Sequence, residues 1–143
     1  MKRRGSLLRL KRFRVDELKR RLGTLDEMKA DLEKKLTDLE DSVVCERQRA
    51  SDSDIGRLAF PSFLQSIDVR RKNIRTTMAD LERERAAQQD DLTAAFQDLK
   101  SFELAEEERL RRAAAAESHA QQSRIDEIAM VRHLRKHAAR QAG

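Results

Sequence analysis

Two histidines near the end of the sequence have the spacing of a metal-binding pair. His133 and His137 are four residues apart, so on a helix both imidazoles would lie on one face, as in a two-histidine metal site. No third ligand accompanies them, and the surrounding stretch is basic, which would repel a cation. The alternative is a solvated helix face, which the sequence favours, and we expect no metal.

The other reactive side chains are equally isolated. The lone Cys45 falls at an outward helical position, and Asp90 and Asp91 are adjacent, so on a helix their carboxylates point about 100° apart. The sequence has no Gly-rich phosphate loop, no metal-type cysteine spacing and no nucleophile elbow. We therefore predict no catalytic residue and no cofactor, and the protein is not expected to be an enzyme.

The composition is that of long helices. Ala, Glu, Lys, Leu and Arg supply 79 of the 143 residues, 40% of the chain is charged, and there are only four Gly and one Pro. Sandwiches, barrels and nucleotide-binding sheets need more turn residues and more aromatic bulk than this. The sequence predicts one all-α domain. It shows no secretory signal and no apolar run of about 20 residues, so we expect a cytoplasmic protein.

A heptad repeat organises the first part of the chain and predicts one helix over residues 7–50. Apolar residues occupy nine of the twelve a and d positions, a pattern typical of a coiled coil. These positions are Leu8, Lys11, Val15, Leu18, Leu22, Leu25, Lys29, Leu32, Leu36, Leu39, Val43 and Glu46.

A cluster of Ser, Asp and Gly with the only proline, residues 51–62, interrupts this repeat and predicts a turn. Ser62 and Gln65 have capping-box spacing, so a second helix is expected from about Phe63, over residues 63–140. Its seam is Leu64, Ile67, Arg71, Ile74, Met78, Leu81, Arg85, Gln88, Leu92, Ala95, Leu99 and Phe102. Two seams of equal length joined by a short connection predict an antiparallel coiled-coil hairpin. If it is centred near residue 56, residue i faces roughly residue 112 − i.

The second helix is longer than the first and should overhang it after about residue 105. At ~1.5 Å per residue the overhang would extend roughly 50 Å. It carries a sparse apolar stripe of Leu110, Ile125, Ile128, Val131 and Leu134. A partner or a second molecule could complete this stripe, or the last dozen residues could fray in the isolated protein.

Both ends of the chain are basic. Residues 1–22 hold ten Lys and Arg against Asp16 and Glu17, and residues 132–143 hold four Lys and Arg and no acid. The open end of the hairpin would therefore attract an acidic surface. The alternative is a charged face that only promotes solubility.

The closed end of the hairpin is apolar instead. Its hydrophobic residues are Leu58, Phe60, Phe63, Leu64 and Ile67. They could plug the seam where the two helices meet, or form a docking surface for a partner.

The basic run before Leu18, Leu25, Leu32 and Leu39 superficially reproduces a dimeric basic leucine zipper that binds nucleic acid. Against this, apolar residues such as Phe13 interrupt the basic run, whereas reading base edges requires polar side chains. A helix lying in a membrane plane over residues 6–14 is a further alternative.

Four stretches carry a more specific signal. They are SLLRLKRFRVDELKRR (6–21), LAFPSFLQS (58–66), AAFQDLKSFELAEEERLRR (94–112) and RIDEIAMVRHLRK (124–136). In this order they resemble the flagellar export protein FliJ family in its alphaproteobacterial form.

The resemblance implies a function that periodicity alone does not. The family is similar to the central stalk of rotary ATPases, with an open end that enters the hexameric ring of the flagellar type III export ATPase and promotes its assembly and activity. The resemblance also implies contacts with the export gate membrane protein and with substrate chaperones, at the cytoplasmic face of the inner membrane at the flagellar base. No nucleic-acid partner is expected. A coiled-coil adaptor outside the flagellum is the remaining alternative.

Position and chemistry then suggest two sets of partner-binding residues. The ring-facing set is Leu8, Arg12, Arg132 and Arg135, and the gate-facing set at the tip is Phe60, Phe63, Leu64 and Ile67.

Overall fold

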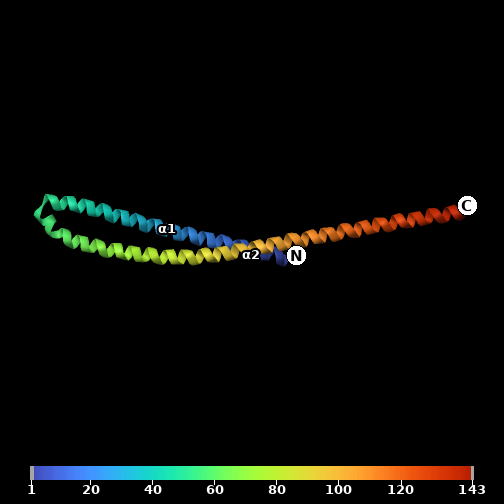
Figure 1. Ribbon diagram of the computed structural model, residues 1–143, viewed down its shortest axis with the longest axis horizontal. Coiled ribbons are helices and arrows are strands. Elements are labelled where there is room, and N and C mark those ends of the chain that lie inside the picture. Colours follow the sequence, from blue (N-terminus) through green and yellow to red (C-terminus); the bar gives the residue numbers. More distant parts are fainter. Residues whose placement is uncertain (1, 143) are drawn as a thin grey trace. The chain divides into compact units, whose positions relative to one another are not determined.

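The computed structural model describes residues 2–142, which form two helices (Figure 1). Helix α1 is Lys2–Asp52 and helix α2 is Asp54–Ala142, so Ser53 is the only described residue outside a helix. The chain divides into two compact units, Met1–Asp98 and Leu99–Gly143, and the boundary falls inside α2. The first unit holds α1 and the beginning of α2, which lie side by side as a hairpin (Figure 1). The predicted all-α hairpin is confirmed.

Helix α1 continues for 51 residues because its residues are mostly strong helix formers. The less favourable residues Thr24, Thr37 and Ser42 are accommodated by hydrogen bonds. Each hydroxyl donates to the backbone carbonyl four residues earlier, at 3.0–3.2 Å, so these three hydroxyls find partners within the helix. The helix therefore runs through the whole heptad pattern and beyond the predicted limits of residues 7 and 50.

The predicted seam is the buried face of the first unit. Every seam position predicted from residue 8 to residue 46 is buried or half-buried, and so is every one predicted from 64 to 95. The deepest side chains are Leu18, which is 0% exposed, and Ile67, which is 1% exposed. Burial of this apolar stripe is what holds two otherwise highly charged helices together.

Four ion pairs across the hairpin confirm the predicted antiparallel register. Each joins a cation at a seam position to an acid on the opposite helix: Lys11 to Asp98, Lys29 to Glu82 (3.4 Å), Arg71 to Glu40 (2.7 Å) and Arg85 to Asp26 (2.7 Å). The residue numbers of the first pair add to 109 and those of the other three to 111, close to the expected 112. A slip of one heptad would displace every pair by roughly 10 Å along the helix. These contacts therefore specify the register, although each exposed pair contributes only about 0.2–1 kcal/mol.

The turn is much shorter than predicted. Residues 54–62 belong to α2, so the expected loop over residues 51–62 and the expected helix start near Phe63 are wrong. The cap is Ser53, whose Oγ accepts a hydrogen bond from the Gly56 amide at 3.0 Å. Asp54 follows in the first turn, where a negative charge favours the helix.

Close packing explains why small residues gather at the turn. A Cβ added to Gly56 would lie 2.8 Å from the Arg49 carbonyl oxygen and 3.1 Å from the Cα of Ala50. Glycine therefore lets the first turn of α2 approach the last turn of α1, and it does not mark a loop here. Pro61 lies inside α2, where it removes one backbone hydrogen bond without ending the helix.

The second unit is the remainder of α2. Every residue from 110 to 142 is exposed. Its helix is supported locally by pairs such as Arg112 with Glu108 at 3.1 Å. The predicted overhang of the second helix after about residue 105 depends on how this unit lies against the first, and it stays a prediction. Neither helix carries, within residues 2–142, a stretch long and apolar enough to cross a membrane.

Candidate partner-binding surfaces

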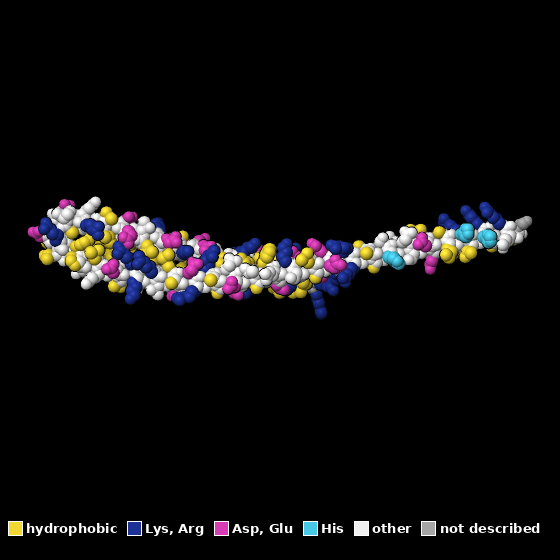
Figure 2. Space-filling view, viewed as in Figure 1, with side chains coloured by type: hydrophobic (Ala, Val, Ile, Leu, Met, Phe, Trp, Pro, Cys, Tyr) yellow, Lys and Arg dark blue, Asp and Glu magenta, His cyan; other side chains and the backbone are white. Residues whose placement is uncertain are grey.

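The tip of the hairpin divides into an inner and an outer set of side chains. Ile67 is buried, and Phe60, Phe63 and Leu64 are half-buried. These four predicted residues therefore close the end of the seam, with part of both phenylalanine rings left accessible. Hydrophobic side chains also reach the surface at this end of the molecule (Figure 2).

The outer set is Ile55 and Leu58, which are 81% and 82% exposed. Leu58 was part of the predicted apolar tip, but Ile55 was not singled out because the surrounding Ser, Asp and Gly suggested a loop. Since these residues are helical, Ile55 and Leu58 lie three positions apart on one face of α2. These two exposed side chains cannot fill the seam, so they are candidates for contact with a partner.

The ring-facing residues lie in two different units. Leu8 is half-buried on the seam side of α1, and Arg12, one turn further, is exposed. Arg132 and Arg135 are exposed on α2 in the second unit. The two pairs are thus separate features, and the structure does not define one site made of all four.

The C-terminal part of the second unit presents both charge and apolar surface. Lys and Arg side chains gather along one edge near its end (Figure 2). The predicted stripe is exposed at every position: Leu110 56%, Ile125 59%, Ile128 55%, Val131 46% and Leu134 59%. An exposed helix with basic and apolar positions can bind a complementary surface.

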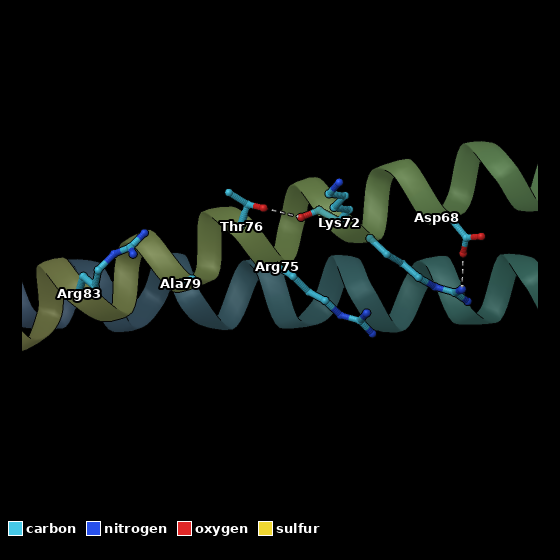
Figure 3. A pocket seen from close by; sticks show the side chains of 7 residues that line it. Asp68, Lys72, Arg75, Thr76, Ala79 and Arg83 are labelled. Carbon is cyan, nitrogen blue, oxygen red and sulfur yellow. Dashed lines mark hydrogen bonds and ion pairs between the residues drawn. The ribbon is translucent and has the colours of Figure 1, made fainter.

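A basic depression on α2 is a surface that sequence reasoning did not single out. It has a volume of about 600 Å³ and is lined by Asp68, Arg71, Lys72, Arg75, Thr76, Ala79 and Arg83 (Figure 3). The sequence signal was only the net positive charge of residues 55–75. A helix places these cations along one face, where they could attract an anionic group.

Two of the four cations in this depression are already engaged by acids. Arg71 bonds Asp68 at 3.1 Å, and its Nε lies 2.7 Å from Glu40 in an ion pair without hydrogen-bond geometry. Arg83 pairs with Asp80. Lys72 and Arg75 form no ion pair with any residue between 2 and 142, so they carry the uncompensated charge of this face.

The electrostatics of the hairpin are otherwise those of a solvated rod. The hydrogen bond to Asp26, followed by that residue's charge, raises the pKa of Arg85. This guanidinium therefore stays charged.

The reactive side chains singled out from the sequence include His133, His137 and Cys45. Among residues 2–142 there is no cluster of three or more His, Cys, Asp and Glu able to hold a metal ion. His133 and His137 are both exposed, and the Nε2 of His137 lies 3.4 Å from the Nε2 of Gln141. Cys45 is a free, exposed thiol.

The zipper alternative conflicts with the packing of the first unit. Leu18 and Leu25 are buried, and Leu32 and Leu39 are half-buried, in a seam shared with α2 of the same chain. A dimeric zipper needs these leucines for a second molecule. Pairing between copies would therefore require the hairpin to open.

Comparison with known proteins adds the family. The family model described as Flagellar FliJ protein matches residues 1–138. No curated protein matches the chain, and no solved structure does.

Proposed function

Because the chain belongs to the flagellar FliJ family and so has a role in flagellar protein export, we propose that it is the stalk of the export ATPase. In this function the basic end enters the ATPase ring, promotes its assembly and raises its rate of hydrolysis. The family is a component of the export apparatus and not itself an enzyme. Family membership also argues against an adaptor outside the flagellum.

One observation carries the proposal: the helix over residues 110–142 has no buried side chain. A helix of 33 residues that covers no core in its own chain is suited to a partner that encloses it. The charged surface favours a shaft that ring subunits can pass, because exposed ion pairs form and break at little cost. Arg132 and Arg135, together with Leu8 and Arg12, are the proposed contacts with the ring.

The tip is the proposed contact with the membrane protein of the export gate. Its accessible parts are the half-buried Phe60, Phe63 and Leu64 with the exposed Ile55 and Leu58, whereas the fully buried Ile67 would hold this surface in place. Empty substrate chaperones are further proposed partners, at the cytoplasmic face of the inner membrane at the flagellar base.

The decisive experiment adds the purified chain to its cognate ATPase. We expect more hexamer by sedimentation and faster hydrolysis, and we expect Arg132→Glu with Arg135→Glu to reduce the activation severalfold. Arg47→Glu with Arg70→Glu is the matched control, because it reverses two exposed arginines in the first unit that line neither the basic depression nor the proposed contact with the ring.

The outcome separates a specific contact from bulk charge. Both double variants change the net charge equally, so a loss confined to the C-terminal pair supports the stalk. If the unaltered chain changes neither hexamer content nor hydrolysis, the stalk proposal fails.

A second experiment concerns the tip. Phe60→Ser with Phe63→Ser should abolish swimming while helicity and ATPase activation are retained, because the rings are partly accessible and lie at the closed end of the hairpin, whereas Leu8 lies near its open end. Ile55→Ser with Leu58→Ser removes only exposed side chains and should also impair swimming. If the phenylalanine variant loses helicity and the outer variant swims normally, the tip is a plug and not a docking site.

A further inference from the structure

The beginning of α1 carries an exposed apolar stripe that starts beside the seam at Leu7 and turns away from it towards Phe13. Leu7, Leu10 and Phe13 are 41%, 62% and 58% exposed. They follow one another at intervals of three residues, so they share one side of the helix. No other stretch of seven described residues in the first unit exposes three large hydrophobic side chains.

Two adjoining grooves run along this stripe. One has a volume of about 430 Å³ and is lined by Leu7, Leu10 and Phe13 together with Lys11 and Arg14. The other, of about 350 Å³, is lined by Leu7 and Leu10 with Arg3 and Ser6. The apolar side chains are thus bordered by cations on both sides along the helix.

The charge around the stripe is mostly positive. Residues 2–14 include seven Lys and Arg and no acid. The two acids at the edge of the larger groove are engaged: Glu17 pairs with Arg14 at 3.4 Å and with Arg21 at 2.7 Å, and Asp98 pairs with Lys11.

We propose that the stripe of Leu7, Leu10 and Phe13, with the cations that line its two grooves, binds the surface of an anionic lipid bilayer, with Leu10 and Phe13 inserted between the headgroups. A helix with an apolar stripe bordered by cations is suited to the boundary between headgroups and acyl chains. The cations attract anionic headgroups, and their long stems allow the charges to stay in water. A neutral bilayer would bury the apolar side chains of the stripe but would not attract the cations beside them.

This surface is distinct from the proposed contact with the ATPase ring. Leu8 and Arg12 are each two residues from Leu10. Two residues correspond to a rotation of about 200° around the helix, so Leu8 and Arg12 lie on nearly the opposite side from Leu10. The bilayer proposal therefore does not depend on the stalk function, and the two can fail separately.

The test uses the full chain and sedimentation with vesicles. We expect binding to vesicles of phosphatidylcholine with phosphatidylglycerol, little binding to phosphatidylcholine alone, and weaker binding as the salt concentration rises. Leu10→Ser with Phe13→Ser should lower the affinity at least about tenfold, since each apolar side chain would lose its place in the bilayer. Val44→Ser with Val69→Ser is the control, because it removes two exposed apolar side chains of the first unit that lie outside the stripe and outside the proposed partner contacts, and it should bind like the unaltered chain.

Insertion can be measured directly because the chain contains no tryptophan. Phe13→Trp should show a blue shift of its fluorescence on adding the anionic vesicles, and Val69→Trp should show none. Circular dichroism verifies that each variant keeps its helicity.

Three results would overturn the proposal. The unaltered chain could fail to bind the anionic vesicles at low salt, which would leave the stripe for a protein partner. The Leu10 and Phe13 variant could bind as well as the control, which would mean adsorption by charge alone. The fluorescence of Phe13→Trp could stay unshifted, which would mean that the stripe does not enter the bilayer.

Discussion

The packing of the hairpin predicts a large effect for one substitution, Leu18→Ala. Leu18 is 0% exposed at a seam position of α1. Facing residues have numbers that add to about 111, as in the Arg85–Asp26 ion pair, so Leu18 lies opposite the region of Leu92 on α2. Truncation removes the part of the side chain that fills this space. The substitution keeps the helix intact, because Ala is the better helix former. Any loss of stability must therefore come from packing between the helices.

The expected loss is about 2–3 kcal/mol. Leu→Ala substitutions in protein cores cost roughly 2–5 kcal/mol, the higher values arising where a cavity stays closed. A seam between only two helices has no third layer, so water can enter the vacated space and the lower part of that range applies. For a unit of this size, the loss corresponds to a decrease in Tm of roughly 10–20 °C.

Thermal unfolding followed by circular dichroism at 222 nm measures this change. Leu10→Ala is the matched control, because it makes the same chemical change on α1 at a side chain that is 62% exposed. It should change stability by less than about 0.5 kcal/mol. The Tm of each protein should also be independent of concentration, since the hairpin is intramolecular.

Two results would refute the reasoning. Equal shifts for Leu18→Ala and Leu10→Ala would mean that the seam does not hold the helices together. A Tm that rises with protein concentration would mean that the seam forms between molecules.

Two further predictions concern the register and the turn. Asp26→Arg should destabilise the hairpin by about 1 kcal/mol, because the pair that it breaks spans the two helices at 2.7 Å. Adding Arg85→Asp reverses the pair and should restore the midpoint of urea unfolding. If the double variant does not recover, the pair does not contribute to stability. Gly23→Ala should stabilise by about 0.5–1 kcal/mol because nothing lies within 4 Å of the new Cβ. Gly56→Ala should destabilise because its Cβ would lie 2.8 Å from the Arg49 carbonyl oxygen, and equal effects of the two glycine substitutions in urea unfolding would contradict the close packing at the turn.

Much of the fold could be predicted because a coiled coil is specified by a short, regular repeat of apolar residues. The spacing of Leu18, Leu25 and their equivalents defines one face of the helix without reference to any distant contact. The proline and the cluster of small residues also located the reversal of the chain near residue 56. Register followed from these two facts, since the seams had to match from the turn outwards.

The turn itself could not be predicted from local signals. Ser, Asp, Gly and Pro over residues 51–62 are typical of a loop, yet Ser53 alone breaks the helix. Gly56 is needed for the contact with Arg49 and Ala50 in the preceding helix, and such a contact is invisible in the sequence. Ile55 was also missed, because its position on an exposed helix face depends on the helix beginning at Asp54 rather than near Phe63.

The sequence by itself determined the helices, the seam and the direction in which the second helix returns, because helical periodicity depends only on residue spacing. Only the tertiary structure decided which charged seam residues find partners and which apolar residues remain at the surface. Lys29 and Arg85 reach acids that are 53 and 59 residues away, and Leu10 and Phe13 stay exposed although Leu18 is fully buried. The physical reason is that a two-helix hairpin has one buried face, and burial depends on which side chains the opposite helix covers.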